Sequence, residues 1–221
     1  MDAFFIPAKA EEKVSIPQKH ITELPERVCL ASSVQFIDSL PPIKAQLENA
    51  GKKASLVKAK HAEFEGQMLG CGWEGLQYDK DAEAFLYIGD GDFHPKALLL
   101  ASDKDVYAFN PFSRSFRKMD EKFRADMNRK RNAGLVKFLH SENIGVLLST
   151  KPGQMRLKEA LSLKGRFPEK KFYYLVANTV DFNELENFNF VECFVNTACN
   201  RLLDDYSKFS KPIVNIADLP K

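Results

Sequence analysis

The chain has 221 residues, with 32 lysines and arginines against 30 aspartates and glutamates, so its formal net charge is +2. A net charge this small does not indicate the basic surface that direct nucleic-acid binding requires. The apolar runs are too short to span a membrane. A chain of this length needs no disulfides to bury a core, and four scattered cysteines without a secretory segment predict a soluble protein of the reducing cytoplasm.

The first half of the chain predicts parallel β-α-β units. Residues 28–35 have the pattern of a buried strand that runs into a polar loop, and 41–53 that of a helix that begins at prolines and ends at Gly51. Strands are expected at 54–59 and 84–88, the latter followed by Gly-Asp-Gly, with a further short strand at 66–71. Strands alternating with helices favour a parallel sheet.

The second half repeats this alternation after a helix expected from about 116 to 140. A strand and polar loop at 144–154 precede a helix at 155–165 closed by Gly165, and strands follow at 171–179, 192–199 and 211–218. We therefore predict an α/β fold with two similar domains, 28–115 and 116–221, each a small parallel sheet flanked by helices.

Two cysteines stand out by their position. Cys71 lies among glycines in GQMLGCGWEG, and Cys199 follows an apolar strand 128 residues later, the interval that also separates FLYIGD (85–90) from IVNIAD (213–218). This spacing predicts an internal repeat with a cysteine at the end of the third strand of each half. Such cysteines could converge on a metal or iron–sulfur cluster, although two buried core thiols remain the alternative. Cys29 and Cys193 lie within strands and are expected in the core.

Two polar loops are candidate ligand sites. Asp90 and His94 lie around glycines after a strand, which suits either a loop that approaches a small polar ligand or a turn with capping carboxylates. Lys151 and Gln154 follow another strand close to a helix start, where free backbone N–H groups could hold a carboxylate or phosphate. The sequence contains no P-loop motif.

Five segments, in this order, resemble the diphthamide synthase family: SSVQFIDSLPPIKAQLENAGKK, GQMLGCGWEG, LYIGDGDFHP, LLSTKPGQMRL and FVNTACNRLLDDYSKFSKPIV. The resemblance implies an enzyme of three related α/β domains, each of which gives one cysteine to a 4Fe–4S cluster that binds S-adenosylmethionine. Reductive cleavage then yields a 3-amino-3-carboxypropyl radical, and this group is attached to a histidine of elongation factor 2.

Carried over residue by residue, the resemblance makes Cys71 and Cys199 the cluster ligands of the second and third domains. It implies an S-adenosylmethionine site formed by residues of the loops that face the same crevice: Gln35, Gly89, Asp90, Gly91, His94, Lys151, Gly153, Gln154 and Asn196.

The chain departs from the family pattern at its start. Residues 1–27 resemble only the end of the first domain, so that domain's cysteine has no counterpart. Cys29 and Cys193 are poor replacements, because each lies roughly 20 Å of extended chain from the loop at its strand's end. A shortened form of a longer protein, a split protein and a natural short form are all consistent with this departure.

The expected partners are elongation factor 2 as protein substrate, an electron donor, and a second copy or a separate chain that completes the cluster. A non-catalytic accessory subunit of the synthase complex is the alternative from another functional class. A neighbouring reading frame that encodes a first domain with a cysteine would distinguish these hypotheses.

Overall fold

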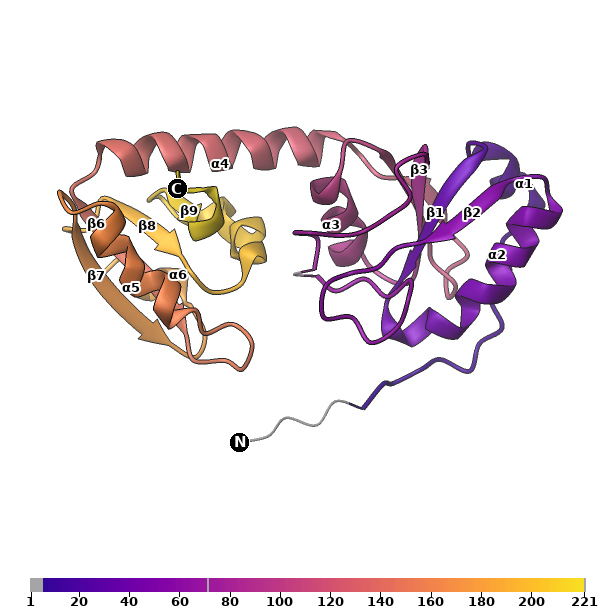
Figure 1. Cartoon of the computed structure of the whole chain (residues 1–221), viewed down its shortest axis with the longest axis horizontal. Helices are drawn as coiled ribbons and strands as arrows, with labels where there is room; N and C mark the ends of the chain where they lie inside the picture. Colours follow the sequence, from indigo (N-terminus) through magenta and orange to yellow (C-terminus); the bar gives the residue numbers. More distant parts are fainter. Residues whose placement is uncertain (1–5, 71, 221) are drawn as a thin grey trace. The chain divides into compact units, whose positions relative to one another are not determined.

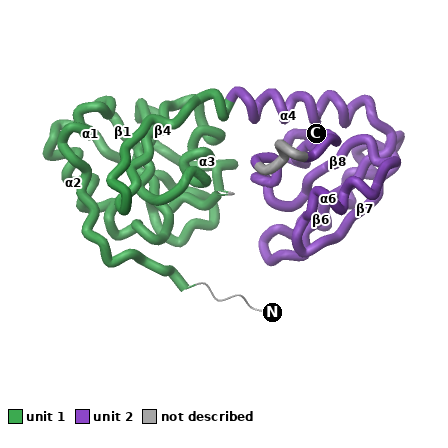
Figure 2. The backbone as a smooth tube through the Cα atoms, turned by 180° about the vertical axis from the view of Figure 1, so that it is seen from behind, with its two compact units in different colours: residues 1–124 green, residues 125–221 purple. Residues whose placement is uncertain are grey.

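The computed structural model describes residues 6–70 and 72–220 (Figure 1). The chain divides into two compact units, residues 1–124 and 125–221 (Figure 2). None of the helices in the described ranges has the length and apolar content of a bilayer-crossing segment.

The first unit is built on a sheet with the strand order β2-β1-β3-β4-β5. Its four parallel strands are β1 (Arg27–Ser32), β2 (Lys53–Leu56), β3 (Ala84–Ile88) and β4 (Asp105–Phe109), and β5 (Phe116–Lys118) pairs antiparallel with β4. Helical segments connect and flank these strands: α1 (Gln18–Glu23), the 3₁₀ segment η1 (Val34–Ser39), α2 (Leu40–Asn49) and α3 (Phe93–Ala101).

Alternate residues of the central strands pack on opposite faces of this sheet. Leu30 of β1 belongs to the cluster formed with α1 and α2, whereas its neighbours Cys29 and Ala31 belong to the cluster formed with α3. Both faces are covered, so residues 28–31 of β1 and the whole of β3 are apolar, as parallel strands commonly are.

The second unit has an all-parallel sheet with the order β7-β6-β8-β9. Its strands are β6 (Asn143–Ser149), β7 (Lys171–Ala177), β8 (Cys193–Asn196) and β9 (Ile213–Asn215). The helical segments are α4 (Lys122–His140, which begins in the first unit), α5 (Leu157–Arg166), α6 (Phe182–Leu185), η2 (Asn200–Lys208) and η3 (Ile216–Asp218).

Helix α4 lies directly on the backbone of β9 because residue 134 is glycine. A Cβ atom at Gly134 would lie 2.5 Å from the carbonyl oxygen of Ile213. The side chains of Phe138, Val146 and Val214 then fill the space between this helix and the sheet.

The predicted α/β class is confirmed, and the two sheets repeat one topology, since β2-β1-β3-β4 and β7-β6-β8-β9 have the same order. The residue-level alignment by 128 positions is wrong. It matches β3 with β9, whereas β3 occupies the place of β8 in the repeated order. Similar short apolar strands at both places allow such a shift by chance.

The expected strand at 66–71 is not formed within its described residues. A single parallel bridge joins Ser32 to Gln67, and Gly66 has φ +85°, a conformation that ends an extended run. The expected helix from 116 begins only at Lys122, because residues 116–118 pair with β4. Gly165 lies within α5, which ends at Arg166.

Candidate functional site

In the first unit, the segment that leads to residue 71 is fixed at the carboxyl end of β1. The backbone N–H of Ser32 donates to Gly66 O (2.8 Å), and the N–H of Met68 donates to Ser32 O (2.7 Å). The Ser32 hydroxyl donates to Ile88 O (2.9 Å), which links this segment to the end of β3. This is the edge at which open α/β sheets bind their ligands.

Cys71 itself lies outside the described residues, so its proposed role as a ligand stays a prediction. The glycine before it is required by packing, because a Cβ atom at Gly70 would overlap the ring of Phe93. A Cβ at Gly72 would lie 3.3 Å from Ala59 Cβ, which is also tight. The glycines therefore let the loop lie close against its neighbours.

The loop after β3 brings together four of the predicted cofactor residues: Gly89, Asp90, Gly91 and His94. One carboxylate oxygen of Asp90 accepts hydrogen bonds from Gly91 N (2.8 Å) and from Asn110 Nδ2 (2.7 Å), while the side chain stays exposed. These bonds join the loops that follow β3 and β4. Asp90 thus bonds within the turn, and its contact with a ligand stays a prediction.

Tyr87 supports this loop and was not identified from the sequence. Its ring is fully buried and stacks on His94, with centroids 5.8 Å apart and planes 14° apart. A Cβ at Gly89 would lie 2.5 Å from the Tyr87 hydroxyl, so glycine there makes room for the phenol. Burial raises the pKa of Tyr87 to about 12, an effect that the nearby Ser33 partly offsets. A tyrosine inside an apolar strand, just before Gly-Asp-Gly, was the available signal.

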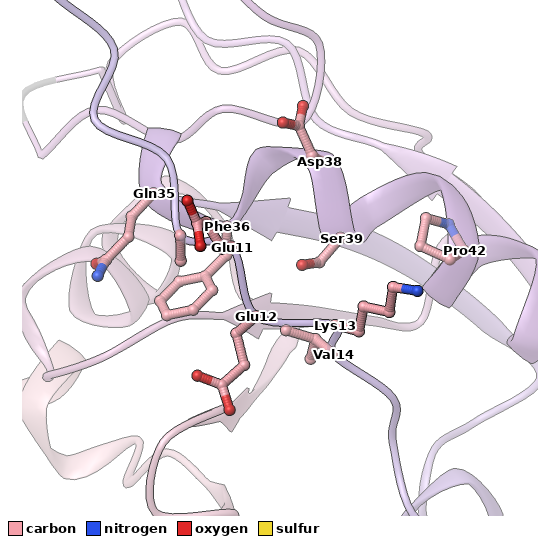
Figure 3. Close-up of a pocket in the computed structure, with 10 residues that line it drawn as sticks. Glu11, Glu12, Lys13, Val14, Gln35, Phe36, Asp38, Ser39 and Pro42 are labelled. Carbon is pink, nitrogen blue, oxygen red and sulfur yellow. The ribbon is translucent and has the colours of Figure 1, made fainter.

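Gln35 lies in η1, which follows β1. It lines a cavity of about 390 Å³ between the N-terminal segment 10–14 and the start of α2 (Figure 3). Its carbonyl oxygen accepts a hydrogen bond from Ala10 N (2.7 Å), which holds that segment in place. Asp90 and His94 do not line this cavity.

In the second unit, a hydrogen-bond network fixes the backbone around Cys199. The amide of Asn196, at the end of β8, donates to Cys199 O (2.8 Å) and to Asn215 Oδ1 (2.8 Å), and its oxygen accepts from Ala198 N (2.9 Å). Asn215, at the end of β9, in turn donates to Asn200 O (3.3 Å). Asn196 is 2% exposed, so these bonds are shielded from water. The Cys199 side chain is half-buried, and the Asn196 side chain fixes the backbone that carries it.

The loop that follows β6 carries three of the predicted cofactor residues: Lys151, Gly153 and Gln154. Strand β6 is the neighbour of β8 in the sheet. Ser149 Oγ accepts from Lys151 N (3.2 Å), Gln154 N donates to Lys151 O (3.0 Å), and Gly153 has φ +77°. Because β6 and β8 are parallel, this loop and the Cys199 loop leave the same edge of the sheet.

Cys29 and Cys193 are fully buried, as expected. Desolvation raises the pKa of the Cys29 thiol and raises that of Cys193 to about 12. Such thiols do not offer the thiolate that iron requires.

Arg201 is a second residue that sequence reasoning missed. It lies in η2, is 3% exposed, and forms an ion pair with Asp204, with Nε and Oδ2 2.6 Å apart. Its i, i+3 spacing from an aspartate was the available signal. A buried ion pair therefore lies in the segment that directly follows Cys199.

The donor set fits an iron–sulfur cluster only in part. Over residues 6–70 and 72–220, no three His, Cys, Asp or Glu side chains form a group able to hold a metal ion. Among the cysteines in these ranges, Cys29 and Cys193 are buried and Cys199 is half-buried.

The comparisons with known proteins agree with the sequence resemblance. The family model described as "Putative diphthamide synthesis protein" matches residues 2–220. A 2-(3-amino-3-carboxypropyl)histidine synthase of Pyrococcus horikoshii is 33% identical over 219 residues, which are 95% of this chain and 62% of the relative. Subunit 1 of the corresponding Caenorhabditis elegans synthase is 26% identical over 86% of this chain and 48% of its own length.

Solved structures give the same result. The crystal structure of Dph2 from Pyrococcus horikoshii has a TM-score of 0.76 at 30% identity, and the structure of that protein with a 4Fe–4S cluster has 0.75 at 31%. Each match covers 90% of this chain and 58% of the solved one, so the chain spans about three fifths of these relatives. The chain therefore belongs to the diphthamide synthesis protein family.

Proposed function

We propose that the chain takes part in the transfer of a 3-amino-3-carboxypropyl group from S-adenosylmethionine to a histidine of elongation factor 2, as a cytoplasmic transferase. The observation that carries the proposal is the Cys199 loop, which has a half-buried thiol on a backbone fixed at the carboxyl end of a parallel strand. A relative similar over 90% of the chain has been crystallised with a 4Fe–4S cluster.

In this proposal Cys71 and Cys199 hold a 4Fe–4S cluster through their thiolates, with further ligands from a second chain or from a longer form of this one. When bound, the cluster supplies the electron that breaks the bond between the sulfur and the γ-carbon of S-adenosylmethionine. The ammonium group of Lys151 suits the substrate's carboxylate, and Asp90 suits its ammonium group or a ribose hydroxyl. The backbone N–H groups of Lys151 and Gln154 are engaged within the loop itself.

Asn196, which the family resemblance places at the S-adenosylmethionine site, also has contacts within the protein. Its amide N–H groups and oxygen are engaged with Cys199, Ala198 and Asn215. In this proposal Asn196 orients the thiol-bearing loop, and its contact with the substrate stays a prediction.

Anaerobic cluster reconstitution tests the proposal. The chain, alone and with any partner that supplies the remaining family domain, is loaded with iron and sulfide, and its iron content and thiolate-to-iron absorbance are measured. We expect Cys71→Ala and Cys199→Ala to lower both, and the matched control Cys29→Ala to leave them unchanged. Unchanged iron content in both ligand variants would show that the ligand assignment is wrong.

A non-catalytic accessory subunit is the second candidate function. It is favoured by the name of a relative, subunit 1 of the Caenorhabditis elegans 2-(3-amino-3-carboxypropyl)histidine synthase, which implies an enzyme with more than one subunit. If the chain takes up no iron with any partner, yet binds another family member, this second function replaces the first.

A further inference from the structure

The cavity between the N-terminal segment 10–14 and the start of α2 contains a buried hydroxyl group. Ser39 is the last residue of η1, is 6% exposed and lines this cavity of about 390 Å³. A serine directly before a helix commonly caps it, but this hydroxyl forms no hydrogen bond with any residue of the described ranges. Figure 3 shows it pointing into the space between the segment and the helix. Buried hydroxyls are normally hydrogen-bonded, so Ser39 indicates that the cavity holds a ligand.

Apolar side chains form part of the cavity wall around Ser39. Phe36 of η1 and Pro42 of α2 lie on either side of it, and Val14 of the N-terminal segment lies across from it (Figure 3). The volume is near the lower end of the range for small-molecule sites, about 300–1,000 Å³. A ligand that fits here is small and has an apolar body, such as a single ring.

Carboxylates outnumber cations around this cavity. Glu11 and Glu12 are exposed lining residues, and neither forms an ion pair within the part of the chain that the structure describes. Asp38 also lines the cavity but is paired with Lys9 (2.8 Å). Lys13 is the one cation among the described lining residues, and its ammonium group extends away from the Glu12 carboxylate in Figure 3. The excess of negative charge attracts a cation and disfavours an anion.

We propose that this cavity binds a small organic cation, an ammonium group on an apolar body of about one ring. The ammonium group donates a hydrogen bond to Ser39 Oγ, and the carboxylates of Glu11 and Glu12 attract its charge. The apolar body packs against Phe36 and Val14.

A ligand in this cavity would also hold the N-terminal segment on the first unit. The segment forms one side of the cavity, and the hydrogen bond from Ala10 N to Gln35 O (2.7 Å) ties it to η1. Because the ligand contacts both sides, it binds only when the segment is in place. Binding therefore shifts the segment toward its docked position.

The cation site is separate from most of the proposed S-adenosylmethionine site. Asp90 and His94, in the loop after β3, do not line the cavity. Gln35 does line it, but its side-chain amide extends away from Ser39 in Figure 3. Neither a cluster nor S-adenosylmethionine is needed for the cation to bind, so the site can be tested independently of the proposed function.

Titration of the isotope-labelled, cluster-free full chain followed by nuclear magnetic resonance tests the proposal. The probes are phenethylamine, phenethyl alcohol, which has the same body without the charge, and phenylacetate, which has the opposite charge. We expect phenethylamine to shift the amide signals of residues 10–14 and 35–40. Phenethyl alcohol should bind about tenfold more weakly, and phenylacetate should cause no shift at these residues.

Substitutions identify the groups that bind the cation. Ser39→Ala should weaken phenethylamine binding about tenfold, because the hydrogen bond to the charged group is lost. It should not lower the free energy of unfolding of the free chain, since the hydroxyl has no partner there among the described residues. Glu11→Gln combined with Glu12→Gln should weaken binding several-fold. The matched control is Glu169→Gln, which changes an exposed acid of the second unit and should leave binding unchanged.

Three results would overturn the proposal. One is that phenethylamine does not shift the signals of the cavity residues. Another is equal binding of the three probes, or binding that none of the substitutions at residues 11, 12 and 39 weakens. The third is displacement of phenethylamine by S-adenosylmethionine, which would assign the cavity to the substrate of the proposed function.

Discussion

Replacing Asn196 with alanine should loosen the Cys199 loop and destabilise the second unit. The substitution removes hydrogen bonds to Cys199 O, Asn215 Oδ1 and Ala198 N, all in a site that is 2% exposed. Each such bond contributes about 1 kcal/mol net, so we expect the free energy of unfolding to fall by about 3 kcal/mol. The exposed Asn187, whose side-chain amide nitrogen lies 3.5 Å from a carboxylate oxygen of Glu184, is the control. Asn187→Ala should change stability by less than about 0.5 kcal/mol.

Two assays on the cluster-free chain read out this effect. Urea unfolding gives the free-energy difference, and the rate of Cys199 alkylation by iodoacetamide in the native state reports loop opening. Asn196→Ala should increase that rate several-fold relative to wild type and to Asn187→Ala. A loss below about 1 kcal/mol together with an unchanged alkylation rate would refute the assignment of Asn196 as the residue that positions the loop.

Further predictions concern packing, pH and thiol reactivity. Gly134→Ala should lower the free energy of unfolding in urea titrations by about 1–3 kcal/mol, because the added Cβ would meet the backbone of β9. Gly165→Ala, in a helix with open space around the glycine, should raise it by about 0.5–1 kcal/mol. Equal effects of the two substitutions would contradict the close approach of α4 to β9. The free energy of unfolding in urea should fall as pH rises from about 9 to about 12, because the folded state keeps the Cys193 thiol protonated after the unfolded state has lost that proton. The fall should be smaller in Cys193→Ala, and an identical pH profile in this variant would exclude the Cys193 thiol as the cause. When native protein is alkylated and its peptides are mapped, Cys199 should be modified first, and Cys29 and Cys193 only after denaturation. Alkylation of Cys29 or Cys193 in the native protein would contradict their burial.

Local sequence patterns were sufficient for most strands and for the α/β class. β1, β3 and β6 are apolar runs followed by polar or glycine-rich loops, and such runs identify buried parallel strands. Helix α3 was not predicted, because its run KALLLAS is also uniformly apolar and shows no helical period. β4, directly after α3, was missed with it.

The candidate site was less accessible to sequence reasoning because its contacts are non-local. Asn196 meets Asn215 across 19 residues only because β8 and β9 pair in a register that places both at strand ends. The grouping of Asp90 with Asn110 likewise depends on the pairing of β3 with β4. A sequence gives the residue types but not which partner each side chain uses, so the bonds from the Asn196 amide to Cys199 O and Asn215 Oδ1 were not predicted.

The amide network beneath Cys199 has a consequence for assembly. In zinc fingers the metal organises the loops that bind it, so folding and metal binding are a single event. Here protein atoms alone hold the turn at residues 196–200, and the loop is preformed before any iron arrives. A cluster built on this thiol would therefore bind to a loop that is already folded. Its loss to oxygen would leave a folded protein that can bind a cluster again.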